Sequence, residues 1–188
     1  MNVMAVSGSP RKGGNTETLI SEAIRGTGLP DVKVYRLQEM DIKPCRSCGG
    51  CEKTGRCVVE DGFQDLYEAI IAADRIILAS PIYFMSVSAQ AKTLIDRCQS
   101  FWCRKYLLNL ELEAGPHGRK GLQLFVGGME RESGIKCAET VGTAFFRTVS
   151  VPAHSTLAYI GVDAKGEIEK HPTALADAFE AGRALVAV

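Results

Sequence analysis

Four cysteines standing close together are the most distinctive chemical feature of the chain. They follow the pattern Cys45-x₂-Cys48-x₂-Cys51-x₅-Cys57, with glycines between them that allow tight turns around a small group. Thiolates are the usual ligands of a [4Fe–4S] cluster, and a C-x₂-C-x₂-C run followed by a fourth cysteine resembles cluster-binding loops. Zinc also accepts four cysteines, but its ligand pairs usually lie further apart in sequence. The pattern therefore favours a [4Fe–4S] cluster, with zinc or a metal-free thiol loop as alternatives.

A second candidate site is the polar segment of residues 7–16, Ser-Gly-Ser-Pro-Arg-Lys-Gly-Gly-Asn-Thr. It joins an apolar run to the start of a helical pattern, where free backbone N–H groups and the helix dipole favour an anion. The candidate cofactor-binding residues here are Ser7, Ser9, Pro10, Arg11, Asn15 and Thr16. The hydroxyl and amide groups are neutral donors, and Arg11 can bind a phosphate through two hydrogen bonds. The alternative is a polar strand-to-helix turn without a ligand, since glycine-rich turns alone are weak signals.

Two later loops supply residues that suit a flat ring. Residues 80–86 (Ser-Pro-Ile-Tyr-Phe-Met-Ser) place apolar and aromatic side chains after a buried run, where stacking or edge contact with a ring would employ them. A glycine pair after the next buried run permits close approach to the backbone. The candidate ring-contact residues are Pro81, Ile82, Tyr83, Phe84, Gly127 and Gly128. Alternatively, the two aromatic side chains pack under the next helix or at a subunit contact.

The elements that must position these loops alternate between strands and helices. Apolar runs predict strands at residues 2–7, 32–37, 74–80, 121–126 and 154–160. Asn15 or Thr16 is predicted to cap a first helix that ends at Gly26 and Gly28, and Asp61 to cap a second. Further helical patterns cover residues 88–107, 132–147 and 173–187. Residues 38–61 show no periodicity. We therefore predict an α/β fold with a doubly wound, five-stranded parallel sheet in three layers, and a Cys-rich insertion at residues 38–61 within one domain of residues 1–188.

The phosphate ligand follows by elimination. A nucleoside triphosphate loop needs GxxxxGK[ST], but Gly14 and Asn15 stand where its lysine and hydroxyl residue belong. A dinucleotide fold needs GxGxxG and an acidic residue after the second strand, where this chain has the sequence Val-Tyr-Arg-Leu at residues 34–37. A hydroxyl-rich loop that suits one terminal phosphate remains. FMN is the cofactor that doubly wound domains hold at this position.

Composition excludes several classes of protein. Lys plus Arg and Asp plus Glu both number 22, so no net field favours nucleic acid or an anionic membrane. No apolar run approaches the roughly 20 residues that span a bilayer, and the first residues lack an export signal. We therefore expect a cytoplasmic protein with no nucleic-acid or membrane partner. Reduced, clustered thiols in that compartment are more often metal-binding or catalytic than cross-linked.

On three segments the sequence resembles the flavodoxin-like NADPH-dependent FMN reductase family, and within it the iron-sulfur flavoproteins. The segments are GSPRKGGNT at residues 8–16, SPIYFMSVSAQAKTLIDR at residues 80–97, and the cysteine segment between them. The resemblance implies a flavodoxin-like fold, tightly bound FMN, and redox chemistry in a homodimer or homotetramer. It carries phosphate contact onto Ser7, Ser9, Arg11, Asn15 and Thr16, and ring contact onto Pro81, Ile82, Tyr83 and Phe84.

These features together predict an FMN-dependent oxidoreductase whose chemistry occurs at the flavin N5, without a catalytic side chain. Electrons would come from NAD(P)H or ferredoxin and pass to a small acceptor such as a quinone, free flavin or an oxygen species. One alternative is a flavodoxin-like electron carrier without a small substrate of its own, and another is a zinc-binding or thiol-sensing regulatory protein. The remaining cysteines, Cys98, Cys103 and Cys137, are predicted to be small core residues.

Overall fold

The computed structural model describes residues 1–110, 112 and 115–187. At its centre lies a parallel sheet with the strand order β2-β1-β3-β5-β6, to which a short antiparallel strand, β4, adds beside β3. The strands are β1 (Val3–Ser7), β2 (Lys33–Arg36), β3 (Arg75–Tyr83), β4 (Ser86–Val87), β5 (Lys120–Gly127) and β6 (Ala153–Ile160). The order of the five parallel strands is that of flavodoxin-like sheets, which confirms the predicted fold class.

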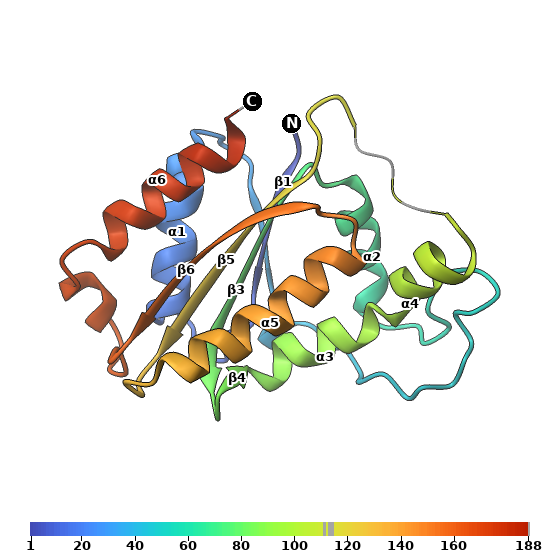
Figure 1. Cartoon of the computed structure of the whole chain (residues 1–188), viewed down its shortest axis with the longest axis horizontal. Helices are drawn as coiled ribbons and strands as arrows, with labels where there is room; N and C mark the ends of the chain where they lie inside the picture. Colours follow the sequence, from blue (N-terminus) through green and yellow to red (C-terminus); the bar gives the residue numbers. More distant parts are fainter. Residues whose placement is uncertain (111, 113–114, 188) are drawn as a thin grey trace.

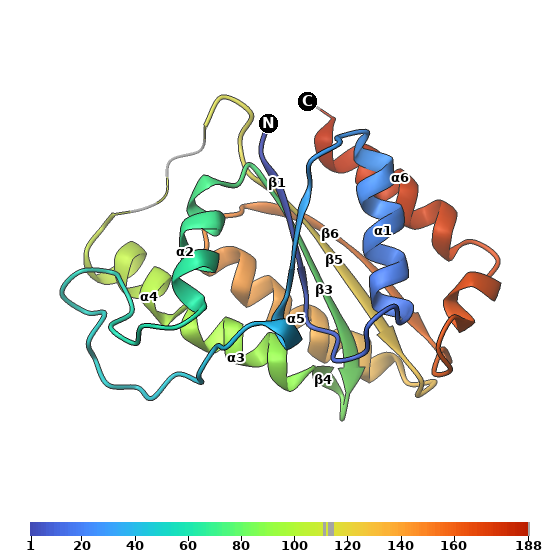
Figure 2. The ribbon, with the colours of Figure 1, turned by 180° about the vertical axis from the view of Figure 1, so that it is seen from behind.

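Helices cover both faces of the sheet, as a parallel sheet with apolar strands requires. Helices α1 and α6 lie on one face, and α2, α3, α4 and α5 lie on the other side (Figure 1, and from behind in Figure 2). The helices are α1 (Asn15–Thr27), α2 (Phe63–Ala72), α3 (Ala89–Arg97), α4 (Gln99–Trp102), α5 (Glu132–Thr148) and α6 (Ala174–Val186), with shorter turns η1 (Leu37–Glu39), η2 (Cys103–Leu107) and η3 (Glu167–Lys170). Among the described residues, no helix combines the length and the apolar character needed to cross a membrane.

The apolar core has two main parts because side chains of a strand alternate between the two faces of the sheet. Ile77 and Leu122 pack toward α1 and α6, whereas Ile76 and Leu78 pack with the aromatic side chains of α2 and α5. Every residue of β1 is buried. The core therefore fixes the central strands and leaves their carboxyl ends, at the lower edge of the sheet in Figure 1, free to carry a site.

Two element predictions were wrong in detail. Strand β3 was expected to end before Pro81, but it continues to Tyr83 and turns back through a tight hairpin into β4. Pro81 is compatible with this because its extended backbone pairs with Val126 although it has no N–H to donate. The helix expected over residues 88–107 is interrupted at Cys98, where ψ is 2°, and ends in the π-helical turn η2.

Helices α1 and α6 are in close contact, and two glycines make this possible. A Cβ atom at Gly26 would overlap the backbone carbonyl oxygen of Phe179, and one at Gly182 would overlap that of Ala23. Gly26 was predicted to end the helix, but it lies within α1. Its lack of a side chain is what lets the two backbones approach.

We expect Gly26→Ala to reduce the free energy of unfolding by about 1–3 kcal/mol, the usual cost of overpacking a tight interface. The same substitution at an unhindered helix position would stabilise the protein by up to about 1 kcal/mol. Chemical denaturation measures the difference. A variant as stable as the wild type would contradict the close contact of the two helices.

Candidate functional site

The loop between β1 and α1 presents the start of a helix without a side-chain cap. The N-cap residue is Gly14, and no side chain caps the helix there. Asn15 and Thr16 were predicted to cap α1, but they lie inside its first turn, and both are buried. Backbone N–H groups at such a helix start favour an anion.

One cavity brings together most of the predicted cofactor-binding residues. It lies at the carboxyl ends of β1, β3 and β5, the place where doubly wound sheets bind ligands. Its lining consists of Ser9, Arg11, Gly14, Asn15, Thr16, Pro81, Ile82, Tyr83, Val126, Gly127, Gly128, Val162 and Asp163. The start of α1 and its polar side chains therefore form one part of the cavity wall. The last residues of β3 (Pro81–Tyr83) and the glycine pair Gly127 and Gly128 form another part. We refer to this as the strand-end cavity.

Three predicted residues do not line the strand-end cavity. Ser7 is fully buried, and its hydroxyl has no hydrogen-bond partner among the described residues. Pro10 lies in the loop outside the lining. Phe84 stands at the tip of the β3–β4 hairpin, is fully exposed, and has a left-handed φ of 46°. An aromatic ring in that position is available to a molecule that approaches from outside.

One wall of the cavity, the loop after β6, was not predicted. Val162 and Asp163 line the cavity from this loop. Arg11 donates a hydrogen bond through Nη1 to the carbonyl oxygen of Asp163 at 3.0 Å, and Asn15 donates through Nδ2 to that of Ala164 at 2.9 Å. The sequence indicated this wall only indirectly. A fifth predicted parallel strand must end at the same edge of the sheet as the others, so the loop that follows it lies near the site.

The residues of the strand-end cavity fit FMN. The uncapped helix start, Ser9, Thr16 and Arg11 supply donors suited to a phosphate. Gly127 and Gly128 form a narrow cradle. A Cβ atom at Gly127 would lie 3.1 Å from Cβ of Ile82, and one at Gly128 would lie 2.9 Å from Cβ of Asp163. The absence of side chains at these two glycines lets a flat ring approach the backbone closely.

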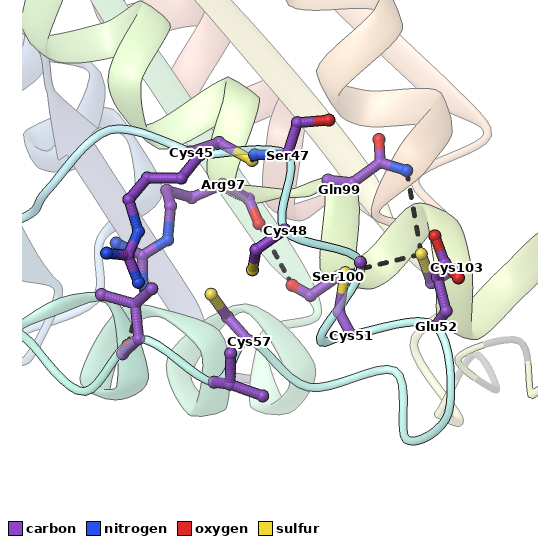
Figure 3. Close-up of a pocket in the computed structure, with 14 residues that line it drawn as sticks. Cys45, Ser47, Cys48, Cys51, Glu52, Cys57, Arg97, Gln99, Ser100 and Cys103 are labelled. Atoms are coloured by element: carbon purple, nitrogen blue, oxygen red, sulfur yellow. Dashed lines mark hydrogen bonds between the residues drawn. The ribbon is translucent and has the colours of Figure 1, made fainter.

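A second cavity contains the thiols (Figure 3). It has a volume of about 90 Å³, and its lining includes the four predicted ligands Cys45, Cys48, Cys51 and Cys57 together with Cys103. We call this group of five the cysteine pocket. Cys103 was predicted to be a core residue, and it is fully buried as expected. It nevertheless belongs to the pocket, because the end of the helical run brings it against the loop.

We call residues 43–61, which carry the four predicted ligands, the cysteine loop. A buried ion pair fastens both ends of this loop to α3. Arg97 and Asp61 are 0% and 1% exposed, and Nη1 of Arg97 lies 2.7 Å from Oδ2 of Asp61. Arg97 also donates to the carbonyl oxygens of Lys43 and Val59, at 2.7 Å and 3.0 Å. These two residues stand just before and just after the four cysteines. The pair therefore holds the loop closed around the pocket.

The carboxylate of Asp61 is stabilised in its charged form. Burial acts to raise its pKa, but hydrogen bonds from Arg97 and from the backbone N–H groups of Lys43 and Phe63 hold that pKa below its usual value. Asp61 was predicted to cap α2, and it does accept a hydrogen bond from Phe63 at the first residue of that helix. Asp61 also pairs with Arg97 and accepts a hydrogen bond from the backbone N–H of Lys43, and these contacts hold the two ends of the cysteine loop together.

Within the cysteine pocket, Cys51 and Cys103 are in direct contact. Their sulfur atoms lie 3.6 Å apart. Burial and the hydrogen bond with Cys103 raise the pKa of the Cys51 thiol to about 12. The third remaining cysteine, Cys137, is exposed, so its assignment to the core was wrong. Cys137 precedes Ala138 on α5, and of these two residues Ala138 is buried whereas Cys137 faces outward.

The donors of the cysteine pocket fit an iron-sulfur cluster by their chemistry. Four thiols from one loop line a common cavity, and thiolates are the ligands that such clusters use. No three His, Cys, Asp or Glu side chains in the described part of the chain lie close enough together to hold one metal ion. The four sulfurs would therefore have to converge on a bound cluster.

Comparison with known protein sequences gives a family match and several similar proteins. The model of the NADPH-dependent FMN reductase family matches residues 1–126. An iron-sulfur flavoprotein from Methanosarcina thermophila is 39% identical over 100 residues, 52% of each chain. Another iron-sulfur flavoprotein, from Methanocaldococcus jannaschii, is 30% identical over 157 residues, 81% of this chain and 74% of that protein. The chain spans about half the length of several curated relatives that it matches.

Solved structures share the fold. An NAD(P)H:quinone oxidoreductase from Methanothermobacter marburgensis superposes with a TM-score of 0.73, covering 100% of this chain and 97% of that one at 17% sequence identity. At that identity the likeness concerns the fold. It agrees with the flavodoxin-like strand order described above.

Proposed function

Because the chain belongs to the NADPH-dependent FMN reductase family, in its iron-sulfur flavoprotein branch, we propose that it is an FMN-dependent oxidoreductase. The observation that carries this proposal is the strand-end cavity, whose lining joins donors suited to a phosphate to a narrow cradle between Gly127, Gly128, Ile82 and Asp163. FMN bound there supplies one- and two-electron transfer at its N5 atom. Residues 1–188 would act as one FMN-binding domain with a Cys-rich insertion at residues 38–61.

The side chains of the strand-end cavity would bind and orient the cofactor. Ser9, Thr16 and the N–H groups at the start of α1 would donate to its phosphate. Arg11 would bring a positive charge to the same end, held by its hydrogen bond to the Asp163 carbonyl. Tyr83 would contact the ring and exclude water from one side. No side chain of the cavity is needed as an acid or a base.

The cysteine pocket would hold a [4Fe–4S] cluster through Cys45, Cys48, Cys51 and Cys57. Such a cluster supplies single-electron transfer. Arg97, whose charge is paired with Asp61, would line the cavity that holds the cluster. The proposed electron donor is NAD(P)H, in keeping with the NADPH-dependent family, or ferredoxin, and the proposed acceptor is a quinone, free flavin or an oxygen species. A homodimer or homotetramer is part of this proposal, and the fully exposed ring of Phe84 is available for such a contact.

The proposed activity is tested by anaerobic mixing of FMN-loaded protein with NADPH or NADH, followed by addition of a quinone. We expect the pyridine nucleotide to bleach the flavin absorbance and the quinone to restore it over many cycles. Flavin that dithionite reduces but neither nucleotide nor reduced ferredoxin reduces would contradict the enzyme. Flavin that ferredoxin reduces, without turnover of a small acceptor, would favour the electron carrier instead.

A further inference from the structure

Cys103 is a fifth thiol in the cysteine pocket and lies outside the four-cysteine pattern. It belongs to η2, and 52 positions separate it from Cys51 in the sequence. The side chain is fully buried, and its sulfur lies 3.6 Å from that of Cys51, within the range of a hydrogen bond between sulfurs (Figure 3). It is therefore placed to act on one particular ligand of the proposed cluster.

Two further contacts fix this arrangement. The side-chain amide of Gln99 donates to the Cys103 sulfur at 3.7 Å. The loop itself packs on the turn that carries Cys103, because a Cβ atom at Gly55 would lie 2.8 Å from Cβ of Arg104. Gly55 also has a φ of +70°, which favours glycine. The turn is π-helical, a geometry that often occurs at functional sites.

We propose that Cys103 is a positioning residue that donates a hydrogen bond to the sulfur of Cys51 when that sulfur is bound to iron. The inference rests on the proposed cluster. A ligand thiolate has no proton, so Cys51 would then only accept. Cys103 accepts from Gln99 and keeps its own S–H for Cys51. Hydrogen bonds to ligand sulfurs help to set the potential of a cluster, and this one would stabilise the more negative, reduced state.

The test compares reduction potentials of the reconstituted cluster, measured by a redox titration followed by electron paramagnetic resonance. Cys103→Ala removes the donor and should shift the potential downward with the iron content unchanged. Cys103→Ser keeps a donor and should restore most of that shift. Cys98→Ala is the matched control, because Cys98 is also buried in the same helical run but does not line the pocket. Its potential should equal that of the wild type.

Other outcomes would overturn the inference in distinguishable ways. Equal potentials in Cys103→Ala and Cys98→Ala would exclude the hydrogen bond while leaving the proposed cluster intact. Loss of iron from both Cys103→Ala and Cys103→Ser, but not from Cys98→Ala, would make Cys103 a ligand or a structural residue. A wild-type protein that takes up no cluster from iron and sulfide would contradict both this inference and the proposed cluster.

Discussion

Asp61→Asn should lower the free energy of unfolding by about 3–5 kcal/mol, because it leaves the buried Arg97 guanidinium without its counterion. Most domains have only about 5–15 kcal/mol of stability, so the loss is large. The wild-type contribution should be fully present above the ordinary carboxyl pKa of 3.8 and should disappear as the pH falls through the lower pKa of folded Asp61. Denaturant titrations at neutral and acid pH measure both effects.

Asp96→Asn is the matched control for this prediction. Asp96 pairs with Lys92 at 2.8 Å, but the two side chains are about half exposed. A pair of this kind contributes only about 0.3–0.5 kcal/mol. Asp61→Asn should also lose iron, since Asp61 and Arg97 hold both ends of the cysteine loop. Equal stability of the two variants, with full iron content, would show that the buried pair does not hold the loop.

Thr16→Val should weaken FMN binding by about 10- to 100-fold. Thr16 is buried in the first turn of α1 and lines the strand-end cavity. A hydrogen bond to a charged group contributes about 1.5–3 kcal/mol, and each 1.4 kcal/mol is about tenfold in affinity. Fluorescence quenching of added flavin measures the dissociation constant. Because the lost contact is to the phosphate, binding of riboflavin, which has none, should change little.

Thr18→Val makes the same chemical change two residues further along α1. Thr18 does not line the cavity, and its hydroxyl lies 3.5 Å from the Gly14 carbonyl oxygen. We expect its FMN affinity to stay close to that of the wild type. If Thr16→Val weakened FMN and riboflavin equally, the phosphate would not lie at the start of α1.

The fold could be predicted largely from local pattern. Strands β1, β5 and β6 begin and end within one residue of the predicted limits because their apolar runs stop at glycine or polar residues. β3 was longer than predicted because its last residues gain their partners from β4 and β5. Those pairings depend on elements outside the strand, so its own residues could not indicate them.

The sites could be predicted only as separate motifs. Spacing identified the four cysteines, since their ligand pattern is local. It could not identify Cys103, which only the folded chain brings to Cys51. Nor could it identify the pairing of Arg97 with Asp61, because the two lie 36 residues apart and the pattern does not indicate their burial. The loop after β6 was missed for the same reason, since its contacts with Arg11 and Asn15 are tertiary.

Binding of FMN and an iron-sulfur cluster to one chain is tested most directly by the absorption spectrum of protein purified without oxygen, together with its iron and flavin content. We expect flavin bands with a broad visible shoulder that dithionite bleaches, an equimolar amount of FMN, and about four irons per chain. A colourless protein that takes up no flavin when FMN is added, and no iron when iron and sulfide are added, would contradict both sites.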